Sequence, residues 1–154
     1  MAEYNKTMMN MISRDGEIFQ VSHPIASMCK TFDRIINEDD DIDEQSDLDL
    51  PCDRVSSKIL TSVIIYCTYH TTQEQMESIN TPFKSTVLTE IVTQQWYANF
   101  IKDVDDDTLF GLVQAAIYLE IQPLSSLALL EMSIRTQGMN LDDMRSYYKI
   151  PARD

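Results

Sequence analysis

Residues 109–130 read LFGLVQAAIYLEIQPLSSLALL and carry a single charged side chain. The run is long enough for a membrane span, which needs about 20 apolar residues. Glu120 stands in its middle, however, and a carboxylate at the centre of a span costs roughly 3 kcal/mol. Pro123 lacks a backbone N–H and suits the first turn of a helix better than its interior. The sequence therefore predicts two amphipathic helices that meet near Ile121 and Pro123.

Signals for helix starts and ends divide the second half of the chain. Asp105 can cap the first of the two helices, and Gly138 suits the position just after the second. Asn140 can cap a third, short helix. Each helix is predicted to carry one apolar face. The face of the first helix comprises Leu109, Leu112, Val113 and Ala116, and that of the second comprises Leu124, Leu127, Leu130 and Ile134. The face of the third comprises Met144, Tyr147, Tyr148 and Ile150. The second half is therefore predicted to be all-helical.

The first half combines short strands with helices. Residues 8–12 and 17–21 are β-prone runs, and the Asp-Gly pair between them predicts a hairpin. Residues 48–50, before Pro51, indicate a third short strand. Residues 22–38 are predicted to hold a short helix and then a second one. Together with the helical second half, these elements predict an α+β fold.

Residues 56–70, SSKILTSVIIYCTYH, are compatible with a strand or a helix. The β-branched run 63–65 favours a strand by propensity. Ile59, Val63 and Cys67 nevertheless share one helical face, and no turn signal interrupts the fifteen residues. A helix is therefore predicted.

Two polar stretches are predicted to lie between these elements. Residues 38–47, EDDDIDEQSD, are expected to form a solvated acidic loop. Residues 71–93 are rich in Thr, Gln and Glu, and they predict a mobile connection. Residues 94–104 return to helical spacing around Trp96.

Length and charge restrict the class of function. A chain of 154 residues suits one domain, and its net charge of −13 and pI near 4.3 disfavour nucleic acid and anionic membrane surfaces as partners. No basic flank precedes an apolar run at the N-terminus, so no secretory signal is expected. Cys29, Cys52 and Cys67 are few and widely spaced, which favours reduced thiols in the cytosol or nucleus.

The residues predict no catalytic constellation, and neither a metal nor a cofactor is expected. His23 and His70 are far apart in sequence and lack the spacing of metal ligands. Cys67 and His70 are three residues apart and could form a nucleophile and base. Cys67 falls on the apolar face, however, where burial makes a thiol inert. A packing role in the core is therefore the favoured interpretation of Cys67 and His70.

Four segments point to a known family. They are DGEIFQV (15–21), VSSKILTSVIIYCTYH (55–70), WYANFIKDVD (96–105) and TLFGLVQAAIYLEI (108–121). In this order and spacing they resemble the Skp family, the F-box adaptors of SCF ubiquitin ligases. The resemblance extends from about residue 10 to residue 150.

This resemblance implies a fold and two protein partners. Residues 1–104 would form a BTB/POZ-like domain with a small sheet, and residues 105–154 a helical dimerisation and F-box-binding part continuous with it. Ile117 and Tyr118 would contact a cullin. The residues expected to bind the F-box of a substrate receptor are Leu109, Val113, Leu124, Leu127, Ile134, Tyr147 and Ile150. The implied function is that of a non-catalytic adaptor, with a weak homodimer as a further expectation.

Three departures from the family pattern matter. Ile117 stands where the family commonly has Asn before the tyrosine, and Gln122-Pro123 replaces Lys-Gly. The sequence ends at Asp154, where relatives continue into a further helix, so weaker F-box binding is expected. The alternative hypothesis is a self-associating BTB-like scaffold that has lost cullin or F-box binding. An enzyme is the least favoured class.

Overall fold

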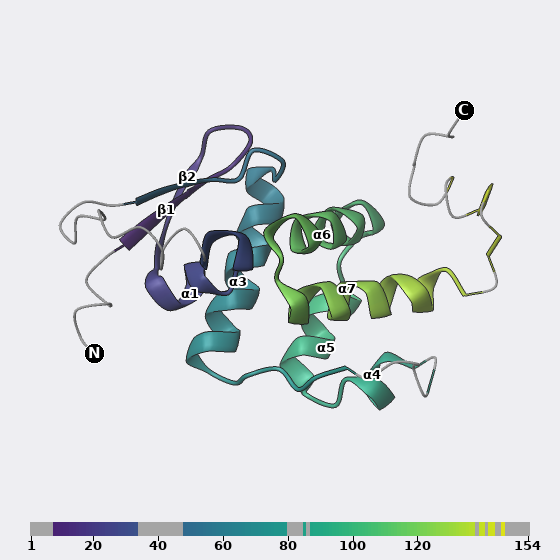
Figure 1. Ribbon diagram of the computed structural model, residues 1–154. Helices are drawn as coiled ribbons and strands as arrows, with labels where there is room; N and C mark the ends of the chain where they lie inside the picture. The colour runs from purple at the N-terminus through teal and green to yellow at the C-terminus, as the bar shows by residue number, and fades with distance from the viewer. Residues whose placement is uncertain are drawn as a thin grey trace.

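The protein has a small sheet at one end and helices packed behind it (Figure 1). Within the sheet, β1 (Met8–Ile12) lies between antiparallel β2 (Ile18–Ser22) and parallel β3 (Leu48–Pro51). This arrangement confirms the three predicted strands and the α+β class. The computed structural model describes residues 8–33, 48–79, 85, 87–137, 139, 140, 142, 143 and 146.

The register of the sheet follows from alternation along β1. Met9 and Met11 are buried, whereas their neighbours in the strand are only partly covered. Met9 pairs with Val21 and Met11 pairs with Leu50, and both partners are buried as well. A slip of one residue would turn all these side chains to the opposite face. Gly16 closes the predicted hairpin with a φ of +87°, which an L side chain rarely adopts.

Two helical segments follow the hairpin. Helix α1 (His23–Ser27) begins after Ser22, as predicted, and residues 30–33 are helical too. The remainder of the predicted second helix and the acidic loop 38–47 lie outside the described residues.

The ambiguous segment is the helix α3 (Ser57–Thr72), which confirms the prediction made from its length. Its β-branched residues do not set its conformation because tertiary packing outweighs their propensity. Leu60, Val63 and Cys67 are buried on one face, while Ile65 is about half exposed on another.

Residues 71–93 contain more structure than their polar composition predicts. Helix α4 (Leu88–Ile91) lies within them, and Met76 is buried. The side chain of Gln94 accepts from the N–H of Glu77 at 2.7 Å and donates to the carbonyl of Gln75 at 2.9 Å. These bonds hold the stretch against the start of α5 (Gln95–Lys102), a helix that was predicted.

The run 109–130 forms parts of two helices, as predicted. Helix α6 (Asp106–Leu119) is capped by Asp105, whose carboxylate accepts from the N–H of Thr108 at 2.9 Å. Helix α7 (Gln122–Arg135) has Pro123 in its first turn and ends three residues before the predicted stop at Gly138, which lies outside the described residues. No helix in the described part of the chain is long and apolar enough to cross a membrane.

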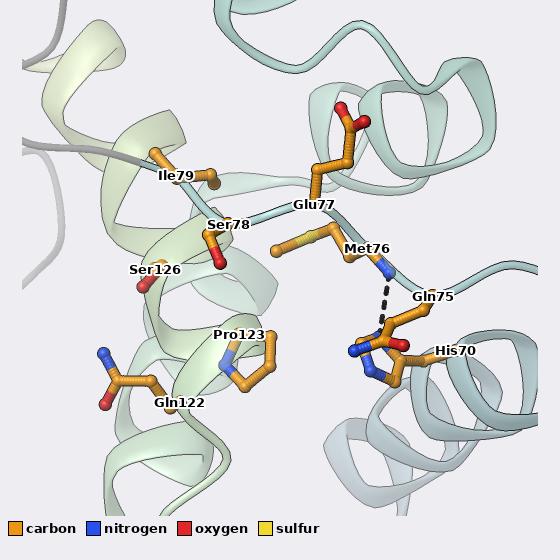
Figure 2. A pocket seen from close by; sticks show the side chains of 9 residues that line it. All are labelled: His70, Gln75, Met76, Glu77, Ser78, Ile79, Gln122, Pro123 and Ser126. Atoms are coloured by element: carbon orange, nitrogen blue, oxygen red, sulfur yellow. Dashed lines mark hydrogen bonds between the residues drawn. The ribbon is translucent and has the colours of Figure 1, made fainter.

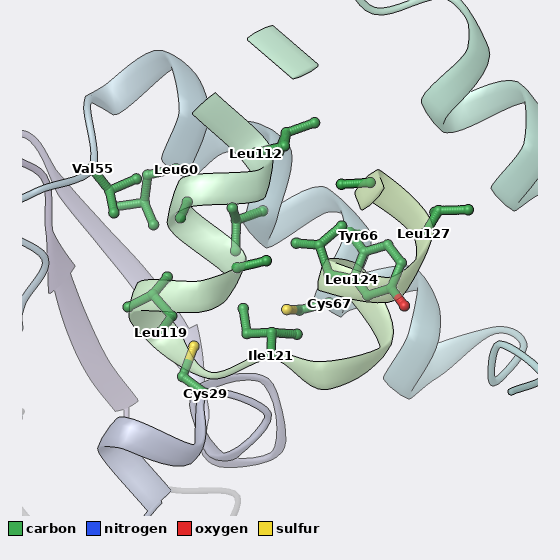
Figure 3. Close-up of a cluster of buried hydrophobic side chains, with 14 of the residues drawn as sticks. Cys29, Val55, Leu60, Tyr66, Cys67, Leu112, Leu119, Ile121, Leu124 and Leu127 are labelled. Atoms are coloured by element: carbon green, nitrogen blue, oxygen red, sulfur yellow. The ribbon is translucent and has the colours of Figure 1, made fainter. Parts of the chain in front are cut away.

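One apolar core joins the two halves of the chain. Helix α6 packs on both α3 and α7, and α7 also contacts α5. Figure 3 shows Leu119, Ile121 and Leu124 in one cluster with Cys29, from the first half, and Tyr66 of α3. Helices α6 and α7 therefore share one core with the first half of the chain.

An ion-pair network fixes the end of α7. The guanidinium of Arg135 contacts Glu131 at 2.6 Å and Asp106 at 2.9 Å. It also donates to the carbonyl oxygens of Ile101 and Lys102 at the end of α5, at 3.4 and 3.1 Å. These bonds satisfy carbonyl groups that a helix end leaves without a partner. Farther on, the N–H of Asp143 donates to Asn140 at 2.8 Å, which agrees with the predicted cap.

The backbone of Glu120, between α6 and α7, allows the strain in this turn to be tested. It adopts the left-handed conformation, with φ 58° and ψ 50°, at a position that favours glycine. We expect Glu120→Gly to be more stable than Glu120→Ala by roughly 0.5–1 kcal/mol, after allowing for the greater freedom of glycine in the unfolded chain. Both variants lose the same carboxylate, so the difference isolates the backbone. Urea unfolding measures it, and equal stability would contradict a strained turn.

Candidate protein-interaction site

Ile117 and Tyr118, the two predicted cullin contacts, lie together in the last turn of α6. Ala116 and Leu119 on either side of them are buried, which follows from their place on the inward face of the helix. Ile117 falls on the opposite face, and 58% of it is exposed. Tyr118 is half-buried. The pair therefore presents an apolar surface next to the α6–α7 turn.

Residues from the first half hold this turn in place. The hydroxyl of Thr31 donates to the carbonyl of Tyr118 at 3.1 Å and to the carboxylate of Glu120 at 3.4 Å. The backbone N–H of Lys30 donates to the carbonyl of Glu120 at 3.3 Å. Because these bonds join residues far apart in sequence, the position of Tyr118 depends on the whole fold.

The β1–β2 hairpin and the loop before α3 are joined beside this surface. The N–H of Arg14 donates to the carbonyl of Val55 at 2.8 Å. The carboxylate of Asp15 accepts from the hydroxyl of Ser57 at 2.7 Å and from its N–H at 2.8 Å. These two bonds lower the pKa of Asp15 to about 2. The carboxylate thus stays ionised and keeps the two loops together at neutral pH.

This junction brings two arginines near Tyr118. Arg14 lies in the hairpin and Arg54 in the adjoining loop, and the guanidinium carbon of Arg54 is 6.0 Å from the centre of the Tyr118 ring. A shallow hollow of about 480 Å³ is lined by Arg14, Arg54, Gln114, Ile117 and Tyr118. Of the described residues that line it, none is acidic. The hollow combines two cationic side chains with Ile117 and the ring of Tyr118.

Ile117 also borders a second hollow, of about 410 Å³, on the side of the α6–α7 turn. Lys30, Glu120, Gln122 and Ser125 contribute its polar lining. Ile117 is therefore a ridge between two depressions. An apolar side chain in that position is well placed to meet a partner that fits into either hollow.

The predicted F-box-binding residues lie elsewhere. Leu109, Leu124 and Leu127 are fully buried, and Val113 is nearly so. Figure 3 shows Leu124 and Leu127 beside Tyr66 in the interior. These side chains are not accessible in the free chain because α6 packs on α3, and α7 packs on α5 and α6, and their contact with an F-box stays a prediction.

The remaining members of that set are partly covered or outside the described chain. Ile134 is half-buried against the core, and Tyr147 and Ile150 lie outside the described residues. The exposed apolar residue on α7 is instead Leu129, with 43% of it exposed. Leu129 was not among the residues predicted from the sequence. Helical spacing places it on a different face of α7 from Leu124 and Leu127, and this difference could have indicated its exposure.

A further hollow, of about 200 Å³, lies between the end of α3 and the start of α7 (Figure 2). The N–H of Met76 donates to Nδ1 of His70 at 3.2 Å, and Gln122, Pro123 and Ser126 form the opposite wall. Burial lowers the pKa of His70 from its ordinary value. The neutral ring is therefore favoured, and it acts as a hydrogen-bond acceptor for the backbone after α3.

The cysteines have the properties of packing residues. Cys29, Cys52 and Cys67 are all buried and free, and burial raises the pKa of Cys67 to about 12. Its thiolate is therefore scarce at neutral pH, which argues against the Cys67–His70 nucleophile. Within the described ranges, no group of three or more His, Cys, Asp or Glu side chains is placed to hold a metal ion.

Comparisons with known proteins point to one family. Residues 7–72 match the model described as the Skp1 family, tetramerisation domain. SKP1-like protein 3 of Arabidopsis thaliana is 34% identical over 151 residues, which cover 97% of this chain and 87% of that protein. The S-phase kinase-associated protein 1 homolog of Tetrahymena thermophila is 27% identical over 145 residues, or 94% and 83% of the two chains. SKP1-like protein 1 of Oryza sativa is 30% identical, covering 97% and 87%.

The acceptor role of His70 predicts a dependence of stability on pH. The pKa of His70 is lower in the folded protein than the ordinary 6.5, so the unfolded chain binds more protons below that pH. The stabilisation by neutral His70 should therefore be fully present above about pH 6.5. The free energy of unfolding should fall as the pH drops below that value toward the folded-state pKa. We expect His70→Gln to reduce the loss of stability between pH 7.5 and pH 5.5, measured by urea unfolding.

His23→Gln is the matched control, because His23 is the other histidine of the chain. It should retain the His70-dependent loss. An equal loss in the wild type and in His70→Gln would show that the bond to Met76 does not govern this pH range.

Proposed function

The chain belongs to the Skp1 family, and from this premise we propose that it is a non-catalytic adaptor of an SCF-type cullin–RING ubiquitin ligase. In this role it bridges a cullin and an F-box substrate receptor, in the cytosol and nucleus. The observation that carries the proposal is the exposed Ile117 beside the anchored Tyr118, at the position that the family resemblance assigns to the cullin.

The proposed mechanism is positional. An adaptor holds the receptor, and therefore its substrate, close to the ubiquitin-charged conjugating enzyme and raises the effective concentration of the two. Such a role needs a rigid body between two contact surfaces. The shared core of α3, α6 and α7 supports it, because the same packed helices carry Ile117 and Leu129.

The receptor contact is proposed to lie on the accessible side of α7. Leu129 is its exposed apolar centre, and Ser133 is exposed one turn beyond on the same side. Ile134 lies five residues from Leu129, about 140° around the helix, and is half-buried against the core, so it would lie at the edge of this contact. Leu109, Val113, Leu124 and Leu127 would then act indirectly, by holding α6 and α7 in place. Tyr147 and Ile150 remain proposed contacts on the strength of the resemblance alone.

Removal of the aromatic ring at the cullin contact gives a direct test. Truncation of an aromatic anchor at an interface typically costs about 2 kcal/mol or more, which is more than tenfold in affinity. We expect Tyr118→Ala to weaken binding of purified cullin at least roughly tenfold and to leave F-box binding unchanged. Isothermal titration calorimetry on both partners measures this.

Tyr118→Phe is the control, since it retains the ring and should bind cullin nearly as well as the wild type. Ile117→Asn restores the family residue, and unchanged affinity would mean that this position is neutral. If the wild type binds no cullin, the self-associating scaffold is the better hypothesis.

Leu127 and Leu129 give a matched pair on α7. Leu129→Asp adds a charge on the accessible side and should abolish binding of an F-box domain with little change in stability. Leu127→Asp buries the same charge in the core and should unfold the protein. Circular dichroism and a binding titration distinguish the two. Ser133 is exposed four residues from Leu129 on the same side of α7, so Ser133→Asp should weaken binding as well, whereas wild-type binding by Leu129→Asp would remove Leu129 from the contact.

A further inference from the structure

The charge around Ile117 differs from that of the chain as a whole. The chain has a net charge of −13, with 12 basic and 25 acidic residues. Two of the basic residues, Arg14 and Arg54, nevertheless meet at one hollow, and none of the described residues that line it is acidic. This surface is therefore a local exception in a field that would otherwise repel acidic proteins.

The fold places these two arginines together by main-chain contacts. The bond from the N–H of Arg14 to the carbonyl of Val55 fixes the hairpin beside the residue that follows Arg54. Asp15, the nearest carboxylate in sequence to Arg14, has both oxygens engaged by Ser57. The guanidinium of Arg54 is held over the ring of Tyr118, 6.0 Å from its centre. The charges thus border the apolar surface.

We propose that Arg14 and Arg54 are specificity-determining residues, and that they select a cullin surface in which an apolar side chain is flanked by carboxylates. The apolar side chain would lie against Ile117 and Tyr118, and the carboxylates would meet the two guanidinium groups. This inference rests on the proposed adaptor function, which supplies the partner at this site. Charge complementarity favours this occupant over nucleic acid, because the remaining charge of the chain is strongly negative.

Rim charges at an interface mainly change the rate of association and its dependence on salt, and the apolar centre mainly changes the rate of dissociation. A steering role for the arginines therefore has a kinetic signature. It differs from the effect of removing Tyr118, which should accelerate dissociation. A merely structural role of either arginine would not make association depend on salt.

The experiment measures association of purified cullin with the full chain by stopped-flow or surface plasmon resonance at about 20 and 200 mM salt, which span the range where screening becomes strong. Arg54→Glu and Arg14→Glu are compared with Lys102→Glu, which makes the same change of charge. Lys102 is exposed at the end of α5, and Arg135 connects this end of α5 to Asp106. Asp106 and Ile117 are roughly 16 Å apart along α6, given the rise of a helix.

We expect each arginine variant to associate about tenfold more slowly than Lys102→Glu at low salt, with a smaller difference at high salt. Arg54→Lys should retain most of the wild-type rate. F-box binding and the melting temperature should be unchanged in all variants. That pattern would support a cationic rim that acts on the cullin.

Three results would overturn the inference. Equal slowing by Lys102→Glu would show an effect of net charge alone. Normal cullin binding by both arginine variants would remove the arginines from recognition and leave the adaptor proposal standing. Failure of the wild type to bind cullin would defeat the adaptor proposal itself, and with it this partner. In that case, sedimentation velocity would measure whether the wild type is a dimer that Arg54→Glu dissociates. Such a result would identify a second copy of the chain as the partner bound at this hollow.

Discussion

The close approach of α6 to α3 is the constraint on which the rest of the structure depends. Gly111 lies at this contact, and a Cβ there would lie 2.7 Å from Cδ1 and 3.0 Å from Cγ1 of Ile59 on α3, so the end of the Ile59 side chain would have to move. Closely packed in this way, α6 buries Leu109, Leu112 and its other inward residues against the first half of the chain. Because α7 then packs on α6, the orientation of one helix against another decides which side chains remain accessible to a partner.

The sequence predicts the elements well because their signals are local. The Asp-Gly hairpin, the Asp105 cap and the proline in the first turn of α7 act within a few residues of their own position, and the structure contains all three. The contacts within the described part of the predicted connection 71–93 could not be predicted. They include the two bonds of the Gln94 side chain and the burial of Met76, which depend on the fold and are not encoded by composition.

The candidate site could be predicted only in part, for a related reason. The resemblance to the Skp family pointed to Ile117 and Tyr118, and the structure places them together at an accessible helix end. Arg14 and Arg54 were missed because forty residues of sequence separate them and a main-chain bond between two loops brings them together. The burial of the leucines was not predicted, because helical spacing identifies an apolar face without telling whether the chain or a partner covers it.

These positions show how one helix could serve both stability and the proposed recognition. The inward face of α6 is occupied by its own core, so any recognition must use side chains about a third of a turn or more away from that face. Ile117, between the buried Ala116 and Leu119, is such a side chain. Its substitution can change affinity without opening a cavity, whereas a change at Leu109 or Leu112 cannot. None of the side chains of Ile117, Arg14 and Arg54 contributes to the buried core, so these three positions could change in sequence while the fold stays the same.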